Sequence, residues 1–473
     1  MLRPLRAATD LRNSIQRSIV RINTTPQLIH HHRLFFTGPK SPVASNHRLI
    51  PAIHPGCDRS VHTQTFTMAS SASSSTTSSP ALPHPLTGLY QPNQLKGLYY
   101  GPDAVKKHIL SVLPNSETSK AFIVTGRSLA TKTKLIQKLE ELLTAKHHAG
   151  TFSEIKEHAP VAQLDEATAQ VERDDTIDTI ISVGGGSPID SAKAIVYRVH
   201  EKTSETGQGK GKWLRHIAIP TTLSAAECTA MAGYTKSDGV KTGLAHPNIY
   251  PSYIFYDPKF GLHTPQSLFL STGIHALDHA VETQYHPLAT WIPARLVSLN
   301  ALAELFRLLP KYKADPTNED VITGLFLAAY GSLGFFGQNL KGGLGLSHTL
   351  GYALGSPYGI PHGITSCLTL GHVVKLKARQ SKANAEAIAA ILPYLGESRS
   401  GDDVKDSDRV GDRILGLVDE LGLKTTLTEK GVGRDQIDII CQRATGGLIP
   451  GKEQSQQDEE TLKSVKKLVE GLY

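Results

Sequence analysis

The segment from Ile177 to Lys193 constrains the fold more than any other part of the chain. Ile177–Val183 is rich in β-branched residues, which is typical of an interior strand of a parallel sheet. Three glycines at 184–186 follow directly, and residues without a Cβ atom let the chain turn sharply and a ligand approach the backbone. Ser187 then suits the N-cap of a helix, and Pro188 suits its first turn. Because the free N–H groups of that helix face the turn, the sequence predicts a phosphate or pyrophosphate site; an ordinary βα turn without a ligand is the alternative.

The same alternation of strands and helices occurs on both sides of this segment. Ala121–Gly126 and His216–Thr222 each read as a buried strand that ends in a turn. Thr131–Lys146 and Ser187–His200 have the apolar spacing of helices. Strands that alternate with helices predict a Rossmann-like parallel sheet, which binds its ligands at the carboxyl ends of the strands.

From about Thr264 the sequence changes to helices that are apolar almost all round, as inside a helical domain. The predicted helices are Leu268–Gln284, Ala294–Leu309, Asp320–Gly337, Gly345–Leu354 and an amphipathic Glu460–Leu472, with a charged loop at Arg399–Arg409. The predicted fold class is therefore α/β plus all-α. We expect an α/β domain over residues 88–260 and a helical domain over residues 261–473.

The first 67 residues differ in charge from the rest. They contain nine Lys or Arg residues and two acidic residues, so they account for the net charge of +7, and the remainder is balanced. A balanced folded part gives no sign of a nucleic-acid-binding surface, and no apolar run reaches the roughly 18 residues of a membrane helix. The four cysteines are scattered and form no CxxC pair. This pattern indicates neither a disulfide framework nor a thiolate metal site, and it is consistent with a reducing compartment.

Residues 1–67 have the Arg-rich, acid-poor composition of a mitochondrial leader. An over-extended start is the alternative, because Met68 offers a second start before a Ser/Pro-rich linker over residues 68–87. We expect a mitochondrial protein if translation begins at Met1 and a cytoplasmic one if it begins at Met68.

Four histidines form a second candidate site. His275 and His279 are four residues apart in a predicted helix, so both imidazoles lie on one face, as two ligands of one metal require. His348 lies in another predicted helix, and His362 lies in a predicted loop framed by proline and glycine. Four neutral nitrogen donors suit Fe²⁺ or Zn²⁺ better than Mg²⁺ or Ca²⁺. With 21 histidines in the chain, hydrogen-bonded core residues are the alternative.

Residues 88–473 resemble the iron-containing (group III) alcohol dehydrogenase family of the dehydroquinate synthase-like superfamily. The run Gly184–Lys193 looks like the pyrophosphate loop of that family, and Pro220–Thr229 looks like its second cofactor loop. The shortness of this second loop is closer to the maleylacetate reductase branch. The resemblance implies a dehydroquinate synthase-like fold, with a dinucleotide-binding domain followed by a helical metal and substrate domain.

The metal positions differ from the family pattern of one aspartate and three histidines. His279, His348 and His362 match the three histidines, and His275 stands in place of the aspartate. Maleylacetate reductases carry asparagine there and work without metal. Tyr352 stands where many members have a further histidine, so the resemblance moves the proton relay to Tyr352 or removes it. Without a metal, the histidines and Tyr352 would hydrogen-bond the substrate oxyanion, which makes His348 and Tyr352 the candidate catalytic residues.

The turn after the strand at residues 121–125 indicates the type of nicotinamide cofactor. Many NAD-using members carry an aspartate near Gly126, where it bonds the ribose 2′-hydroxyl. Arg127 could instead pair with a 2′-phosphate, which favours NADP(H). The residues that the resemblance assigns to cofactor binding are Gly126, Arg127, Gly184, Gly185, Gly186, Ser187, Asp190, Thr221, Thr222, Ser224, Thr229 and Lys241, the last near the nicotinamide ribose.

The expected function is that of an NAD(P)-dependent oxidoreductase, which transfers a hydride between the nicotinamide and a small alcohol/aldehyde or ketone. One alternative is metal-independent reduction of an enoate or keto acid, as in maleylacetate reductase. Another is a catalytically silent nucleotide-binding homologue. A lyase like dehydroquinate synthase would need basic residues around the histidines, which the sequence does not show. The expected partners are a small-molecule substrate and a second copy in a homodimer, not nucleic acid or membrane.

Overall fold

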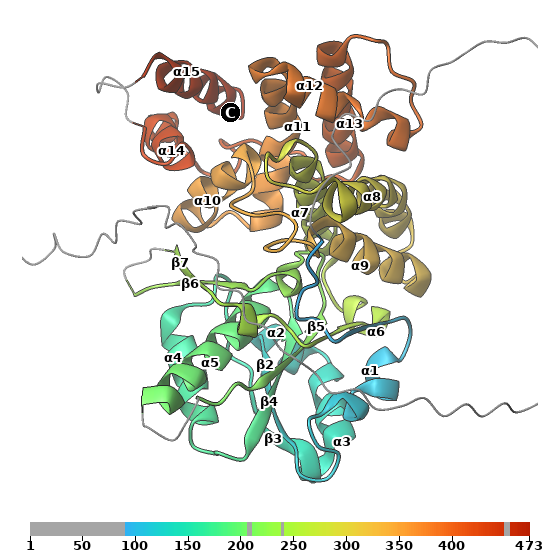
Figure 1. The fold of residues 1–473 in the computed structure, drawn as a ribbon, viewed down its shortest axis with the longest axis vertical. Coiled ribbons are helices and arrows are strands. Elements are labelled where there is room, and N and C mark those ends of the chain that lie inside the picture. Colours follow the sequence, from blue (N-terminus) through green and yellow to red (C-terminus); the bar gives the residue numbers. More distant parts are fainter. Residues whose placement is uncertain (1–89, 206–210, 238–240, 449–454) are drawn as a thin grey trace, which may run out of the picture. The chain divides into compact units, whose positions relative to one another are not determined.

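The computed structural model describes residues 90–473, except 206–210, 238–240 and 449–454 (Figure 1). The predicted leader over residues 1–67 and the linker over residues 68–87 lie outside the described residues. Among the residues described, no helix combines the length and the apolar character that crossing a membrane requires.

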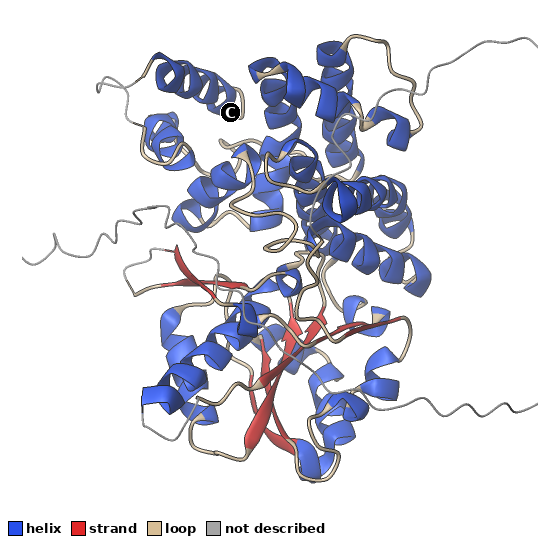
Figure 2. Cartoon of the chain, viewed as in Figure 1, coloured by secondary structure: helices blue, strands red, loops and turns tan. Residues whose placement is uncertain are grey.

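A six-stranded parallel sheet, red in Figure 2, forms the centre of the α/β part. Its strand order is β1-β8-β5-β4-β2-β3. The strands are β1 (Gly97–Tyr100), β2 (Lys120–Thr125), β3 (His148–Phe152), β4 (Ile177–Gly184), β5 (Arg215–Pro220) and β8 (Tyr253–Tyr256). Alternate residues of β2 enter two different apolar clusters, Ile123 on one face and Phe122 on the other. Burial of both faces explains why these strands read as continuous apolar runs, and the predicted Rossmann-like sheet is confirmed.

Helices and a hairpin complete this part. They are α1 (Ala104–His108), α2 (Arg127–Lys132), α3 (Leu135–His147), α4 (Val161–Val171), α5 (Gly186–Glu205), and the antiparallel pair β6 (Met231–Thr235) and β7 (Lys241–Ala245). Three short 3₁₀ helices are η1 (Leu110–Val112), η2 (Ala226–Cys228) and η3 (Pro247–Ile249).

Two predicted helix starts in this part were wrong. The helix predicted from Thr131 begins at Leu135, because α2 ends at Lys132 and Thr133 is extended, with φ −132° and ψ 168°. The helix after the glycine turn begins at Gly186, so Ser187 lies inside its first turn rather than at its N-cap. Pro188 lies in that first turn, as predicted, because its missing N–H has no intrahelical partner there.

Every regular element from Pro258 onward in the described chain is helical. The helices are α6 (Pro258–Gly261), α7 (Gln266–Tyr285), α8 (Leu296–Ala314), α9 (Glu319–Leu333), α10 (Leu346–Tyr358), α11 (His362–Gln380), α12 (Lys382–Ala389), α13 (Asp403–Glu420), α14 (Ile437–Ala444) and α15 (Gln456–Glu470). A π-helical turn, η4 (Trp291–Arg295), and two 3₁₀ turns, η5 (Leu392–Leu395) and η6 (Arg434–Gln436), lie between them. The five helices predicted here agree with the structure to within five residues at each end.

Two predictions in the helical part were wrong. The segment Arg399–Arg409 is not wholly a loop, because α13 begins at Asp403, where the Asp402 carboxylate accepts hydrogen bonds from two backbone N–H groups. Such a cap satisfies the free donors of the first turn. His362 does not lie in a loop but is the first residue of α11.

Helix α7 is buried along most of its length, since every residue from Phe269 to Gln284 is buried. Close packing requires a glycine in its second turn. A Cβ atom at Gly273 would lie 2.4 Å from Leu309 Cδ2 and 3.2 Å from Leu223 Cδ1. Gly273 therefore lets α7 approach both α8 and the loop that follows β5.

His216 in β5 should make the free energy of unfolding fall in acid. Its ring is buried, with Nε2 2.8 Å from Ser182 Oγ, and burial together with the charge of Lys193 lowers its pKa from 6.5 to about 3. The neutral ring therefore contributes stability above pH 6.5, and this contribution is lost as the pH falls toward the folded pKa. The slope is at most about 1.4 kcal/mol per pH unit. His216→Gln should reduce this slope between pH ~6.5 and ~4, as measured by urea unfolding.

The control is His263→Gln, because His263 is exposed and its replacement should leave the slope unchanged. Identical pH dependence in wild type and His216→Gln would contradict the prediction.

Candidate functional site

The glycine turn lies against the loop that follows β5. Gly184 ends β4 with φ +142°, a region that favours glycine, and its carbonyl accepts a hydrogen bond from Thr221 N at 2.9 Å. A Cβ atom at Gly185 would lie 3.2 Å from Thr222 Oγ1, and one at Gly186 would lie 3.5 Å from Ser224 Oγ. The structure thus brings together the two loops to which the sequence assigned cofactor binding.

This turn fits the pyrophosphate of a dinucleotide. The absence of Cβ atoms at Gly185 and Gly186 leaves a bare backbone between β4 and the 20-residue helix α5, and Ser187 lies in the first turn of that helix. Free N–H groups at a helix start bind anions, and the helix dipole adds to the attraction.

Asp190 and Thr229, also predicted to bind cofactor, have partners within the fold. Asp190 Oδ2 accepts a hydrogen bond from Gly233 N at 3.0 Å. Lys193 Nζ lies 3.4 Å from Asp190 Oδ1 and donates to Thr229 Oγ1 at 3.2 Å. Both side chains therefore join α5 to the segment between η2 and β6, and their contact with a cofactor stays a prediction.

Lys193 is a buried cation that sequence reasoning missed. Its side chain is 0% exposed, and Nζ also donates to Ala226 O and Met231 O, each at 2.6 Å. Burial lowers the pKa of this ammonium group, and the Asp190 carboxylate opposes the shift. The signal was present, because Lys193 is the last residue of the glycine-loop motif.

The other three predicted cofactor residues lie apart from these contacts. Gly126 follows β2, which pairs with β4, so it lies at the carboxyl ends of the strands beside the glycine turn. Arg127 begins α2 and is exposed. Lys241 is the first residue of β7, and its side chain lies outside the described part of the structure.

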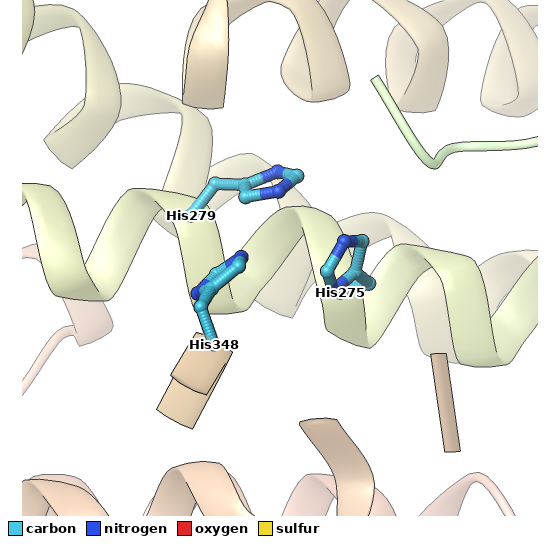
Figure 3. Close-up of side chains that lie close together, drawn as sticks. All are labelled: His275, His279 and His348. Carbon is cyan, nitrogen blue, oxygen red and sulfur yellow. The ribbon is translucent and has the colours of Figure 1, made fainter. Parts of the chain in front are cut away.

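The four predicted histidines come together (Figure 3 shows three of them). His275 and His279 project from one face of α7, with ring centroids 4.4 Å apart. His348 reaches them from α10, and nitrogen atoms of these three residues all lie within 4.8 Å of one another. The ring centroid of His362, at the start of α11, lies 4.7 Å from that of His275.

The donor atoms of this cluster fit a transition-metal ion. His348 Nδ1 lies 2.8 Å from Glu282 Oε2, so Nδ1–H donates to the carboxylate and Nε2 keeps its lone pair. Among the described residues, buried His348 Nε2 and His279 Nδ1 have no hydrogen-bond partner. Buried polar atoms usually have one, and imidazole nitrogens suit iron or zinc.

The protonation of these histidines is set by burial and by nearby charge. Burial lowers the pKa of His279 well below its ordinary value, and the charges of His348 and His362 add to the shift. Burial also lowers the pKa of His348, but the carboxylates of Asp278 and Glu282 outweigh it and raise the pKa overall. The imidazole of His279 is therefore neutral at physiological pH, and a neutral ring nitrogen can donate its lone pair to a metal ion.

Sequence reasoning also missed two carboxyl groups behind the histidines. Asp278 and Glu282 lie on α7 and are 0% and 1% exposed. Burial raises the pKa of Asp278 to about 7, with His348 lowering it and Glu282 raising it. Each follows a histidine by three residues, and this spacing, which places side chains on neighbouring faces of a helix, could have revealed them.

Tyr352 on α10 lies beside the cluster. It is 54% exposed and stacks on His362, with ring centroids 5.4 Å apart. Partial burial raises the pKa of its phenol, and the carboxylates of Asp190 and Glu282 add to this. Tyr352 is thus a protonated phenol at neutral pH, within electrostatic reach of both α5 and α7.

A direct contact joins the histidine helix to the second predicted cofactor loop. Leu223 N donates to Thr272 Oγ1 at 3.1 Å, and Thr272 precedes His275 by one helical turn on α7. The glycine turn, the loop after β5 and the four histidines therefore form adjacent parts of one site.

Comparisons with known proteins agree with this arrangement. The family model "Iron-containing alcohol dehydrogenase" matches residues 96–258, and "Fe-containing alcohol dehydrogenase family, C-terminal" matches residues 269–470. A maleylacetate reductase from Rhizobium sp. (strain MTP-10005) is 27% identical over 63% of this chain and 75% of its own length. An NADPH-dependent butanol dehydrogenase from Clostridium saccharobutylicum is 28% identical over 78% of this chain and 95% of its own length. In structure, the chain is similar to the maleylacetate reductase from Agrobacterium tumefaciens, with a TM-score of 0.65, 22% identity and coverage of 82% and 98%.

Lys193→Met should strongly destabilise the α/β part. The variant leaves two carbonyl oxygens and the Asp190 carboxylate without their buried cation, which costs about 3 kcal/mol of unfolding free energy. Chemical denaturation of the full chain measures the loss.

Lys202→Met on the same helix is the control, because Lys202 is 59% exposed and pairs with Glu172 at the surface. Its loss should cost under about 1 kcal/mol. Equal losses in the two variants would show that the buried contacts of Lys193 add nothing.

Proposed function

The chain belongs to the iron-containing alcohol dehydrogenase family and is an oxidoreductase, and on that premise we propose its reaction. It transfers a hydride between NADP(H) and the carbonyl carbon of a small, uncharged alcohol/aldehyde or ketone. The observation that carries this proposal is the contact between Leu223 and Thr272, which joins the dinucleotide loops to the helix that bears two of the four histidines.

The glycine turn is the proposed pyrophosphate site. The bare backbone at Gly185 and Gly186, facing Thr222 and Ser224, leaves room for two phosphate groups beside the start of α5. The nicotinamide would then extend toward the loop after β5 and the histidines. A cofactor held by its backbone-bound pyrophosphate is positioned for transfer without large motion, which lowers the entropic part of the barrier.

The proposed preference for NADP(H) rests on Arg127. Its exposed guanidinium follows Gly126 at the end of β2, and guanidinium groups bind phosphate in a two-pronged geometry. Relatives of equal identity differ in cofactor, because the butanol dehydrogenase from Clostridium saccharobutylicum is named as NADPH-dependent and the methanol dehydrogenase from Bacillus methanolicus as NAD-dependent. Arg127 therefore carries the proposed preference by itself.

His275, His279, His348 and His362 are the proposed metal ligands. The buried, unpartnered nitrogens of His279 and His348 support this assignment. Bound Fe²⁺ or Zn²⁺ would supply Lewis-acid polarisation of the substrate oxygen. Metal binding requires neutral imidazole rings that are held in place. His279 is neutral, and Glu282 holds the ring of His348.

Tyr352 is the proposed proton donor, with His348 beside it at the candidate catalytic site. In the reducing direction, bound NADPH would supply a hydride to the carbonyl carbon, and the carbonyl oxygen would need a proton. Because its pKa is raised, the Tyr352 phenol is protonated and can donate a hydrogen bond to that oxygen. An alkoxide is more basic than a phenolate, so proton transfer from the phenol is downhill.

Reduction of an enoate or keto acid is the second candidate, favoured by the similarity to maleylacetate reductases. The carboxyl groups of Asp190, Glu282 and Asp278 add to the raised pKa of the Tyr352 phenol. Negative charge beside Tyr352 favours a neutral carbonyl compound over a dianionic substrate.

The reaction is tested by following NADPH oxidation with short aldehydes and ketones, and separately with maleylacetate, in the Fe²⁺- or Zn²⁺-loaded full chain. We expect turnover with the neutral carbonyl compounds. Because a bound metal contributes several kcal/mol to the transition state, His279→Ala should lower kcat by about 1000-fold and remove the bound metal measured by elemental analysis.

Each contrary result has a distinct meaning. Turnover of maleylacetate alone, unchanged by His279→Ala, would establish the second candidate. Tight NADPH binding without turnover of any carbonyl or enoate, with or without added metal, would identify a catalytically silent homologue.

Arg127→Gln should weaken NADPH binding and leave NADH binding unchanged. Loss of a charge-assisted hydrogen bond worth about 1.5–3 kcal/mol corresponds to a Kd about tenfold to 100-fold higher. Fluorescence titration of both cofactors measures the effect, with Lys132→Gln, exposed on the same helix α2, as the control. An equal loss of affinity for NADH and NADPH would contradict a role in binding the 2′-phosphate.

A further inference from the structure

We propose that Asp278 and Glu282 are positioning residues for metal binding: they orient His275 and His348 and supply the negative charge that an all-histidine ligand set lacks. The proposal rests on the metal site of the proposed function. It assigns a role to two carboxyl groups that neither bind the proposed cofactor nor belong to the four histidines.

Glu282 is held in one orientation from several sides. Its Oε2 lies 2.8 Å from His348 Nδ1, and its Oε1 accepts hydrogen bonds from Ser347 N at 2.8 Å and Tyr285 OH at 3.2 Å. The backbone approaches closely at Gly345, where a Cβ atom would lie 2.6 Å from Glu282 Oε1. Because the carboxylate cannot turn away, Nδ1 of His348 carries the proton and Nε2 is left for a metal ion.

Asp278 reaches the histidines by two routes. Its Oδ2 accepts a hydrogen bond from Ser347 Oγ at 2.6 Å, and its Oδ1 lies 3.5 Å from His348 Nδ1. Ser366 lies beside both groups: it lowers the pKa of the Asp278 carboxyl group, and its Oγ lies 2.9 Å from His275 Nδ1. A Ser366 hydroxyl directed toward Asp278 would accept from Nδ1–H of His275 and so orient that ring.

The two carboxyl groups could also balance the positive charge of a bound metal ion. Four neutral imidazoles place no negative charge next to a divalent cation, and a buried cation without a counter-charge is costly. Asp278 and Glu282 are fully buried one layer behind the ligands, where little water would screen them from a bound cation. That cation would favour the ionised form of Asp278.

The test uses full-length, metal-free protein titrated with Zn²⁺ in competition with a chromophoric chelator. Glu282→Gln and Asp278→Asn keep the side-chain shape and remove the charge. We expect each to raise the Kd for Zn²⁺ by about tenfold to 100-fold, the usual cost of losing a residue that orients a metal ligand. Asp419→Asn is the matched control, because it makes the same carboxylate-to-amide change at an exposed position of α13. Its Kd should stay within about twofold of wild type.

Thermal unfolding of each metal-free variant separates positioning from stability, because a purely structural role would lower Tm and leave the Zn²⁺ affinity of the folded protein unchanged. Folded Glu282→Gln and Asp278→Asn proteins with wild-type Kd would overturn the inference. If Glu282→Gln does not fold, Asp278→Asn decides. A wild-type protein that binds neither Zn²⁺ nor Fe²⁺ would overturn the proposed metal site itself, and this inference with it.

Discussion

Helix α7 carries both imidazoles and carboxylates and is almost entirely buried, and the packing of the helical part depends on how these polar groups are partnered. Helix α7 has no exposed residue between Phe269 and Gln284, so polar groups on it can be partnered only from inside the protein. Ser347 and His348 on α10 and Ser366 on α11 meet this need for Asp278 and Glu282. The packing of three helices and the chemistry of the site therefore follow from the same polar contacts.

A second buried charge has the corresponding role in the α/β part. Lys193 lies on the inner face of α5 and donates to the carbonyl oxygens of Ala226 and Met231. These contacts hold Ala226 in the second cofactor loop, and Met231 at the start of β6, against the helix that begins at the glycine turn. The backbone can pass close to that turn because Gly185 and Gly186 have no side chains. Lys193 therefore connects the two loops of the proposed cofactor site.

The sequence predicted the parallel sheet, the glycine turn and the gathering of the four histidines. These predictions were correct because each rests on a local pattern: β-branched runs, a Cβ-free turn, and His275 and His279 spaced by one helical turn. The prediction that His362 lies in a loop was wrong. Proline and glycine flank it in the sequence and suggested a loop, but Pro361 immediately precedes α11, which begins at His362. The sequence did not predict α11 to α14. The homodimer, the mitochondrial leader and the domain boundaries stay predictions.

What the sequence determined by itself is the set of local elements and the residue types available for chemistry. Only the tertiary structure decided that Asp278 and Glu282 face His348 and that Lys193 joins two loops, because these contacts link residues up to 70 positions apart. Local patterns carry no information on which distant groups share a buried space. Because an unpaired polar group is costly once it is buried, these buried groups need their partners. Burial also raises the pKa of Asp278 and lowers that of His279.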